Sequence, residues 1–145
     1  MILPQHQASL PYNPYATDNL ACGLYRQLLV KALSARYIQL NKSNEIVFIV
    51  FDIDRENGAD AWHRMEHLPP YCVIVNPDNT HAHIVYKLKV GVHLNPQSNR
   101  RAIAKLKAII AAMTLKLDAD PCYTGLIAKN PFCDHWHTNL ICPDD

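Results

Sequence analysis

The sequence predicts an α+β domain in which helices flank a mixed or antiparallel β-sheet. The apolar run from Ile46 to Asp54 is unbroken, rich in β-branched and aromatic residues, and typical of a strand buried on both faces. Tyr71 to Asn76 and Ala82 to Leu88 flank the turn-forming residues NPDNT and predict an antiparallel hairpin. An apolar stripe of helical period follows at Ile103, Leu106, Ile110, Met113 and Leu117.

The remaining elements are predicted in chain order. Residues 1–16 contain three prolines and are expected to form an extended arm, with the folded domain spanning residues 17–145. The spacing of Leu20, Leu24, Leu28 and Ala32 predicts a helix from Thr17 or Asp18 to about residue 36.

Three further elements complete the prediction. A short helix is expected from about Gly58 to Leu68, because two prolines follow it. Ser98 or Asn99 is expected to cap the long helix, which would end before Asp118. A last strand is predicted over residues 124–128.

Composition bounds the class of protein. A chain of 145 residues, 49% hydrophobic and 19% charged, suits one soluble globular domain. It has neither an apolar run long enough to span a bilayer nor a signal-peptide pattern, so we expect a cytoplasmic protein without a membrane partner. Five cysteines without a CxxC motif indicate reduced thiols. The net charge of +1 means that any nucleic-acid binding must use a local basic surface.

Paired carboxylates are the strongest chemical signal. Asp52 and Asp54 lie two positions apart at the end of a strand, so both side chains point to the same face. Two carboxylates held this close repel unless a cation lies between them, and hard oxygen ligands suit Mg²⁺ or Mn²⁺. Such a pair can hold two metal ions in phosphoryl transfer. The alternative is a plain strand end, with Asp54 capping a helix or pairing with Arg55.

Other candidate groups are spread along the chain. His81 and His83 share one face of a strand and could donate to phosphate or bind metal. Asp120 could bring a third carboxylate to the pair, and Lys129 with Asn130 could present a cation and an amide to phosphate. A basic run at Arg100, Arg101, Lys105 and Lys107 reads as a solvated helix face. The tail contains zinc-ligand types at Cys133, His135, His137 and Cys142, without zinc-finger spacing.

Taken together, these segments resemble a known family. The blocks RYIQLN, VFDIDR, PPYCVIVNPDNTHAHIVYKL and LDADPCYTGLIAKNP, with Trp62 and Trp136, follow one another from about Tyr12 to Trp136. In this order they resemble the replicase family of plasmid replication initiators, which belongs to the archaeo-eukaryotic primase superfamily.

The resemblance implies a fold and a site. It implies an RNA-recognition-motif-like catalytic core, with metal on Asp52, Asp54 and the later Asp120, although Asp118 is an alternative for the third position. His83 is then expected to contact the triphosphate, helped by the nucleotide-binding residues Arg55, Lys129 and Asn130.

The resemblance also implies an activity and its partners. The expected activity is template-directed nucleotidyl transfer, a primase activity that makes a primer from NTPs on DNA at a plasmid origin. Specific origin binding would need a C-terminal region that this chain lacks.

Two other functions fit parts of the sequence. His81 and His83 weakly match the His-hydrophobic-His pair of a metal-dependent nicking endonuclease of rolling-circle replication, with a tyrosine such as Tyr123 as nucleophile. A non-catalytic nucleotide- or DNA-binding module is the third possibility, although three repelling acids would gain it little.

Overall fold

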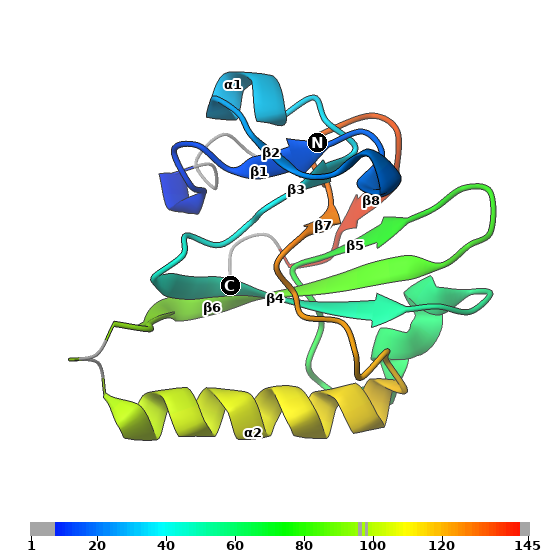
Figure 1. Ribbon diagram of the computed structural model, residues 1–145. Coiled ribbons are helices and arrows are strands. Elements are labelled where there is room, and N and C mark those ends of the chain that lie inside the picture. Colours follow the sequence, from blue (N-terminus) through cyan, green and yellow to red (C-terminus); the bar gives the residue numbers. More distant parts are fainter. Residues whose placement is uncertain (1–7, 96, 98, 143–145) are drawn as a thin grey trace.

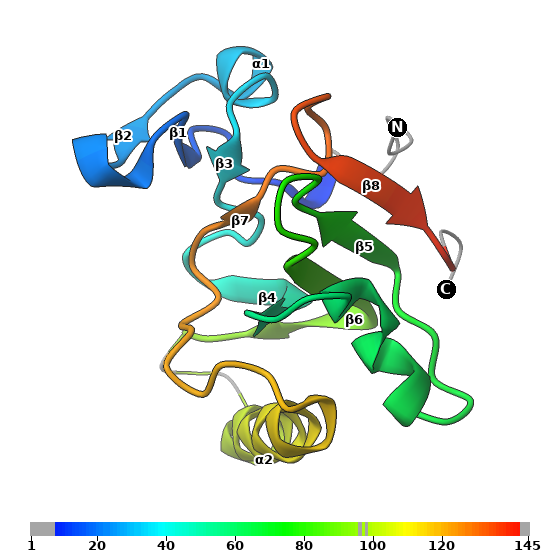
Figure 2. The same cartoon turned by 90° about the vertical axis from the view of Figure 1, so that its right-hand side faces the viewer.

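The computed structural model describes residues 8–95, 97 and 99–142, which form two antiparallel sheets and one long helix (Figure 1). The predicted α+β class is confirmed. Sheet A has the strand order β2-β1-β3-β7, and sheet B has the order β4-β6-β5-β8. Figures 1 and 2 show sheet B in the middle, with the long helix α2 on one side of it and sheet A on the other.

Sheet B contains the strands that the sequence predicts. They are β4 (Glu45–Ile53), β5 (Cys72–Val75) and β6 (Ala82–His93), and β5 and β6 form the expected antiparallel hairpin. Since β6 lies between β4 and β5, the three strands have the order of a split β-α-β unit. The sequence did not reveal β8 (His137–Leu140), which pairs with the free edge of β5.

Helices cover one face of sheet B. The helix α2 (Arg100–Leu117) begins at Asn99, whose side chain accepts a hydrogen bond from the backbone N–H of Arg101, as one of the two predicted caps. The other, Ser98, lies outside the described residues. The predicted helix at 58–68 is a shorter 3₁₀ helix, η3 (Gly58–Arg64).

The prediction for residues 17–36 is wrong, because no long helix forms there. This stretch runs through β1 (Tyr15–Thr17), η2 (Leu20–Cys22), β2 (Tyr25–Arg26) and α1 (Leu29–Ala32), and then enters β3 (Tyr37–Ile38). Gly23 has a φ of 94°, which a right-handed helix does not allow. Leu20, Leu24 and Leu28 are exposed, so their helical spacing did not reflect a buried stripe.

The last strand of sheet A is also shorter and later than predicted. β7 is Ala128–Lys129, so only one residue of the predicted strand 124–128 is a strand residue. Leu10 and Ala16, from the segment predicted as an arm, are buried in the core that sheet A shares with sheet B.

Alternation along β4 determines which side chains face which layer. Ile49, Phe51 and Ile53 belong to the core cluster under α2, whereas Phe48 and Val50 belong to the cluster shared with sheet A. Asp52, two residues after Val50, therefore points toward sheet A. It pairs in register with His83 of β6, which extends toward the same side.

Candidate metal and nucleotide site

Three carboxylates meet at the end of β4. Asp52 lies in β4, Asp54 follows that strand, and Asp120 follows α2, and carboxylate oxygens of all three lie within 4.8 Å of one another. The backbone N–H of Asp120 donates to the backbone carbonyl of Asp52 at 2.8 Å, which holds the third carboxylate beside the pair. Asp118 instead ends α2 with a φ of 51°, and its largely exposed side chain lies 3.9 Å from Arg55.

This group fits a divalent cation. Asp52 Oδ1 is buried and accepts no hydrogen bond within the described part of the chain, a costly arrangement for a carboxylate oxygen without a cation. Burial raises the pKa of Asp52, but the His83 side chain and the charge of Lys129 outweigh it and hold that pKa below the usual value. The carboxylate is therefore ionised at neutral pH, and three carboxylates are ligands that Mg²⁺ and Mn²⁺ accept.

His83 is held behind the carboxylates in one protonation state. Its Nδ1 accepts a hydrogen bond from the backbone N–H of Lys129 at 3.0 Å, so the neutral ring carries its proton on Nε2. Nε2 lies 3.3 Å from Asp52 Oδ1, without the angles of a hydrogen bond. Burial lowers the pKa of His83 although Asp52 acts in the opposite direction, which favours the neutral ring.

The second histidine lies at the outer end of the same strand pair. His81 Nδ1 is 3.7 Å from Asp54 Oδ1, and both side chains are partly exposed. Each aspartate of the pair therefore has one histidine beside it. Neither contact is a hydrogen bond, because the His81 contact is too long and the His83 contact lacks the angles.

A cavity of about 380 Å³ opens over these groups. Its charged wall contains Asp52, Asp54, His83 and Lys129. Its apolar wall comes from η2 and the residues just after it, from β3, and from the loop before β7. Lys129 is buried, with Nζ 5.5 Å above the ring of Trp136, and burial lowers its pKa although Asp52 and Asp54 act in the opposite direction. The cavity thus combines one ammonium, one imidazole donor and two acids.

Two predicted nucleotide-binding residues do not line this cavity. The Arg55 guanidinium donates to the carbonyls of Leu117 and Asp118 at 2.9 and 2.6 Å and so caps the end of α2. Asn130 is fully buried, its amide nitrogen donates to three carbonyls around α1, and its Oδ1 accepts from the backbone of Phe132. Both side chains therefore stabilise the structure around the site.

Sequence reasoning missed the apolar wall. Leu20 and Leu24 were assigned to a helix, and Tyr37 carries no motif, yet all three line the cavity. Tyr123 also lines it, with its hydroxyl donating to the carbonyl of Ile127, and burial followed by the charge of Asp52 raises its pKa. None of these apolar residues belongs to a sequence motif that would mark a site. They come together only in the folded structure.

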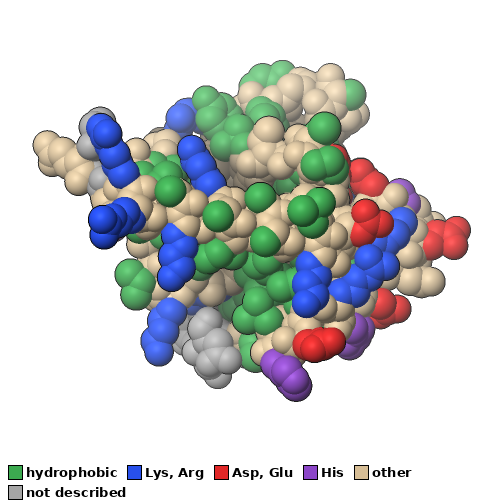
Figure 3. All heavy atoms as spheres, turned by 90° about the horizontal axis from the view of Figure 1, so that it is seen from below, with side chains coloured by type: hydrophobic (Ala, Val, Ile, Leu, Met, Phe, Trp, Pro, Cys, Tyr) green, Lys and Arg blue, Asp and Glu red, His purple; other side chains and the backbone are tan. Residues whose placement is uncertain are grey.

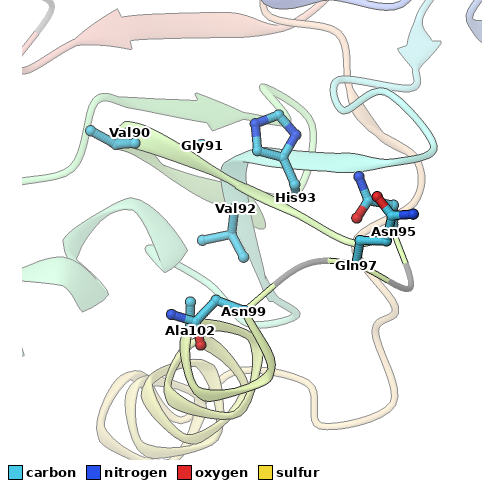
Figure 4. Close-up of a pocket in the computed structure, with 8 residues that line it drawn as sticks. All are labelled: Val90, Gly91, Val92, His93, Asn95, Gln97, Asn99 and Ala102. Carbon is cyan, nitrogen blue, oxygen red and sulfur yellow. The ribbon is translucent and has the colours of Figure 1, made fainter.

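A second cavity lacks this combination of groups. A cavity of about 540 Å³ between the end of β6 and the start of α2 is lined by Val90 to His93, amide side chains and Ala102, with no carboxylate (Figure 4). Within the described residues, the aspartates are the one set of three or more potential metal ligands, so the Cys/His tail forms no such group there. No described helix has both the length and the apolar character to cross a membrane.

Comparison with known proteins gives one match. The model of the Replicase family matches residues 9–144, nearly the whole chain and every residue of the site. No curated protein and no solved structure matches.

Proposed function

The chain belongs to the Replicase family, and we propose that it is the catalytic domain of a plasmid replication initiator that joins nucleotides into a primer on a DNA template. The observation that carries the proposal is the convergence of Asp52, Asp54 and Asp120 within 4.8 Å beside a cavity with a buried lysine. In this proposal the domain is cytoplasmic and binds NTPs, and its split β-α-β unit is the RNA-recognition-motif-like core of a primase.

The three aspartates would hold Mg²⁺ or Mn²⁺, which supplies charge neutralisation and activation of the oxygens during phosphoryl transfer. Asp52 is ionised and has a buried oxygen without a donor, so it is prepared for a cation. Asp120 is fixed by its backbone bond to Asp52 and completes the set.

The residues around the metal ligands bind and orient the nucleotide. The ammonium of Lys129 balances triphosphate charge in a largely buried position, where a charge pair is strengthened by the low dielectric. The single proton on His83 Nε2 is the donor for a phosphate oxygen. Leu20, Leu24 and Tyr37 form the apolar side on which the sugar and base lie.

The nicking endonuclease is less well supported by the same geometry. A metal bound to His83 needs a nitrogen lone pair, but the Nδ1 lone pair already accepts from Lys129 and the Nε2 position carries the proton. Tyr123 donates its hydroxyl hydrogen to Ile127, and its raised pKa disfavours the tyrosinate nucleophile. A module that only binds nucleotides leaves the three repelling aspartates without a purpose.

Calorimetric titration with Mn²⁺ tests the metal centre. Asp52→Asn and Asp120→Asn should each lower Mn²⁺ affinity by more than about 10-fold, because each removes one charged ligand. Asp118→Asn is the matched control, since it changes a nearby carboxylate outside the group and asparagine tolerates its positive φ. Equal affinity in all three variants would contradict the metal assignment.

Incorporation of a labelled NTP on a single-stranded template then tests the chemistry. Asp52→Asn should abolish incorporation and Asp118→Asn should retain it. A covalent DNA–protein adduct that disappears in Tyr123→Phe would instead support the nicking endonuclease.

A further inference from the structure

Positive charge is concentrated in one segment of the chain. From Lys87 to Leu117 the sequence contains seven Lys and Arg residues and no Asp or Glu, although the whole chain has a net charge of only +1. This segment comprises most of β6 and all of α2. In Figure 3 the half of the surface toward the start of α2 shows Lys and Arg side chains without acidic ones, whereas acidic side chains lie among further Lys and Arg side chains toward its end.

One line along α2 connects this basic region to the aspartates. Arg100, Ala104, Lys107, Ala111 and Thr114 follow a 4-3-4-3 spacing, which places them along one side of the helix over about 21 Å. The first four are exposed. We call these five residues the α2 row.

The α2 row leads into a groove that ends at the metal site. A cavity of about 450 Å³ is lined by Lys107, Ala111 and Thr114 on one side and by Asp120, Pro121 and Tyr123 on the other. Tyr123 also lines the nucleotide cavity, and Asp120 is one of the three candidate metal ligands. The groove therefore connects the α2 row, through Lys107, with the place where a nucleotide would react.

We propose that the α2 row and this groove bind a single strand of DNA and direct it to the aspartates. Arg100 and Lys107 neutralise phosphates along the row, while the small Ala104 between them and Ala111 beyond Lys107 allow the sugar-phosphate backbone to approach the helix. The inference rests on the proposed function only in its claim that the strand reacts at the aspartates. Binding of the strand by the basic surface does not depend on the proposed function.

The lining of the groove favours a single strand over a duplex. Ile110, Leu115 and Pro121 are apolar, and Leu115 is 83% exposed beside the groove. Unpaired bases can lay their apolar faces on such residues, whereas a duplex keeps the faces of its bases stacked inside and presents phosphates and base edges. A groove with the cation Lys107 at one end and apolar residues along it thus fits an unpaired strand.

Fluorescence anisotropy of a labelled single-stranded 12-mer, without metal or NTP, tests the proposal on the whole chain. Arg100→Gln with Lys107→Gln should lower affinity about 25-fold at 100 mM salt and reduce the slope of log K against log salt by about 1.4, because two phosphate contacts are lost. The matched control is Arg101→Gln with Lys105→Gln, which removes the same charge from a line about 120° around the helix. The control should retain most of the affinity and slope.

A neutral pair of variants separates contact from long-range charge. Ala111→Gln should weaken binding because its side chain blocks the row, whereas Ala112→Gln, at an adjacent exposed helical position, should not. The proposal would be overturned if the two charge variants lost equal affinity for the 12-mer, or if the two alanine variants bound it equally well. Tighter binding of a duplex of the same length would also overturn it. Because the assay contains no metal, failure of the Mn²⁺ titration would refute the proposed function without affecting this result.

Discussion

Two substitutions of His83 can separate its structural role from its proposed role in binding phosphate. Nδ1 accepts from the backbone of Lys129, and Nε2 carries the proton assigned to phosphate. In His83→Asn the amide oxygen replaces Nδ1 as acceptor, but nothing replaces the donor at Nε2. In His83→Gln the amide nitrogen can donate near the Nε2 position, but the buried N–H of Lys129 loses its acceptor.

The two variants should therefore fail in opposite assays. A hydrogen bond to a charged group contributes about 1.5 to 3 kcal/mol, so His83→Asn should lower NTP affinity about 10- to 150-fold with little loss of stability. An unsatisfied buried N–H costs about 1 to 3 kcal/mol, so His83→Gln should lower the free energy of unfolding by that amount and keep most of the NTP affinity.

Urea denaturation and NTP titration of both variants provide the measurement, with Mn²⁺ titration alongside. Mn²⁺ affinity should change little in either variant, because the ring is not a metal ligand in the proposed site. Full NTP affinity in His83→Asn would refute the phosphate role. Loss of Mn²⁺ binding in that variant, with Asp52→Asn harmless, would assign the metal to the histidines instead.

Three further predictions concern residues that do not line the cavity. Asn130→Ala should lower the free energy of unfolding by about 3 kcal/mol, because it removes several buried hydrogen bonds at once. A loss of NTP affinity without a loss of stability would instead support the prediction from the sequence that Asn130 binds nucleotide. Arg55→Gln should lower the free energy of unfolding, measured by urea denaturation, by about 1 to 2 kcal/mol, because it removes the hydrogen bonds that cap the end of α2. A loss of NTP affinity without a loss of stability would contradict this role. Burial raises the pKa of Cys72 to about 12, so iodoacetamide at pH 8 should label the exposed Cys22 and Cys122 in the native protein and label Cys72 only after unfolding, as read by mass spectrometry.

The sequence predicted those elements whose signal is local and long. β4 is an unbroken apolar run, α2 has a sustained apolar period with a capping asparagine, and the β5–β6 hairpin has a turn between alternating strands. The carboxylate pair was predictable for the same reason, because Asp52 and Asp54 occupy alternate positions at the end of one strand. Asp120 was a candidate from its place in the sequence and was supported by the family resemblance, but its backbone bond to Asp52 joins residues far apart in the chain and was not predictable.

Sheet A was not predictable from local pattern. Its strands are two or three residues long, and each finds its partner through pairs such as Tyr37 with Lys129. Such strands are stabilised by tertiary contacts rather than by their own propensity. The leucines at 20, 24 and 28 therefore have a helical spacing but form no helix. For this reason the apolar wall of the cavity beside the aspartates could not be predicted.

The hydrogen bond from Lys129 to His83 also has a consequence for biosynthesis. During translation β4 and β6 can pair once residue 93 has emerged from the ribosome, but the ring of His83 gains its backbone donor only when β7 arrives. The cavity likewise lacks its ammonium until that point. A nascent chain in which only β4, β5 and β6 have paired would thus still lack two groups that the proposed nucleotide site needs, because β7 and β8 follow later in the chain.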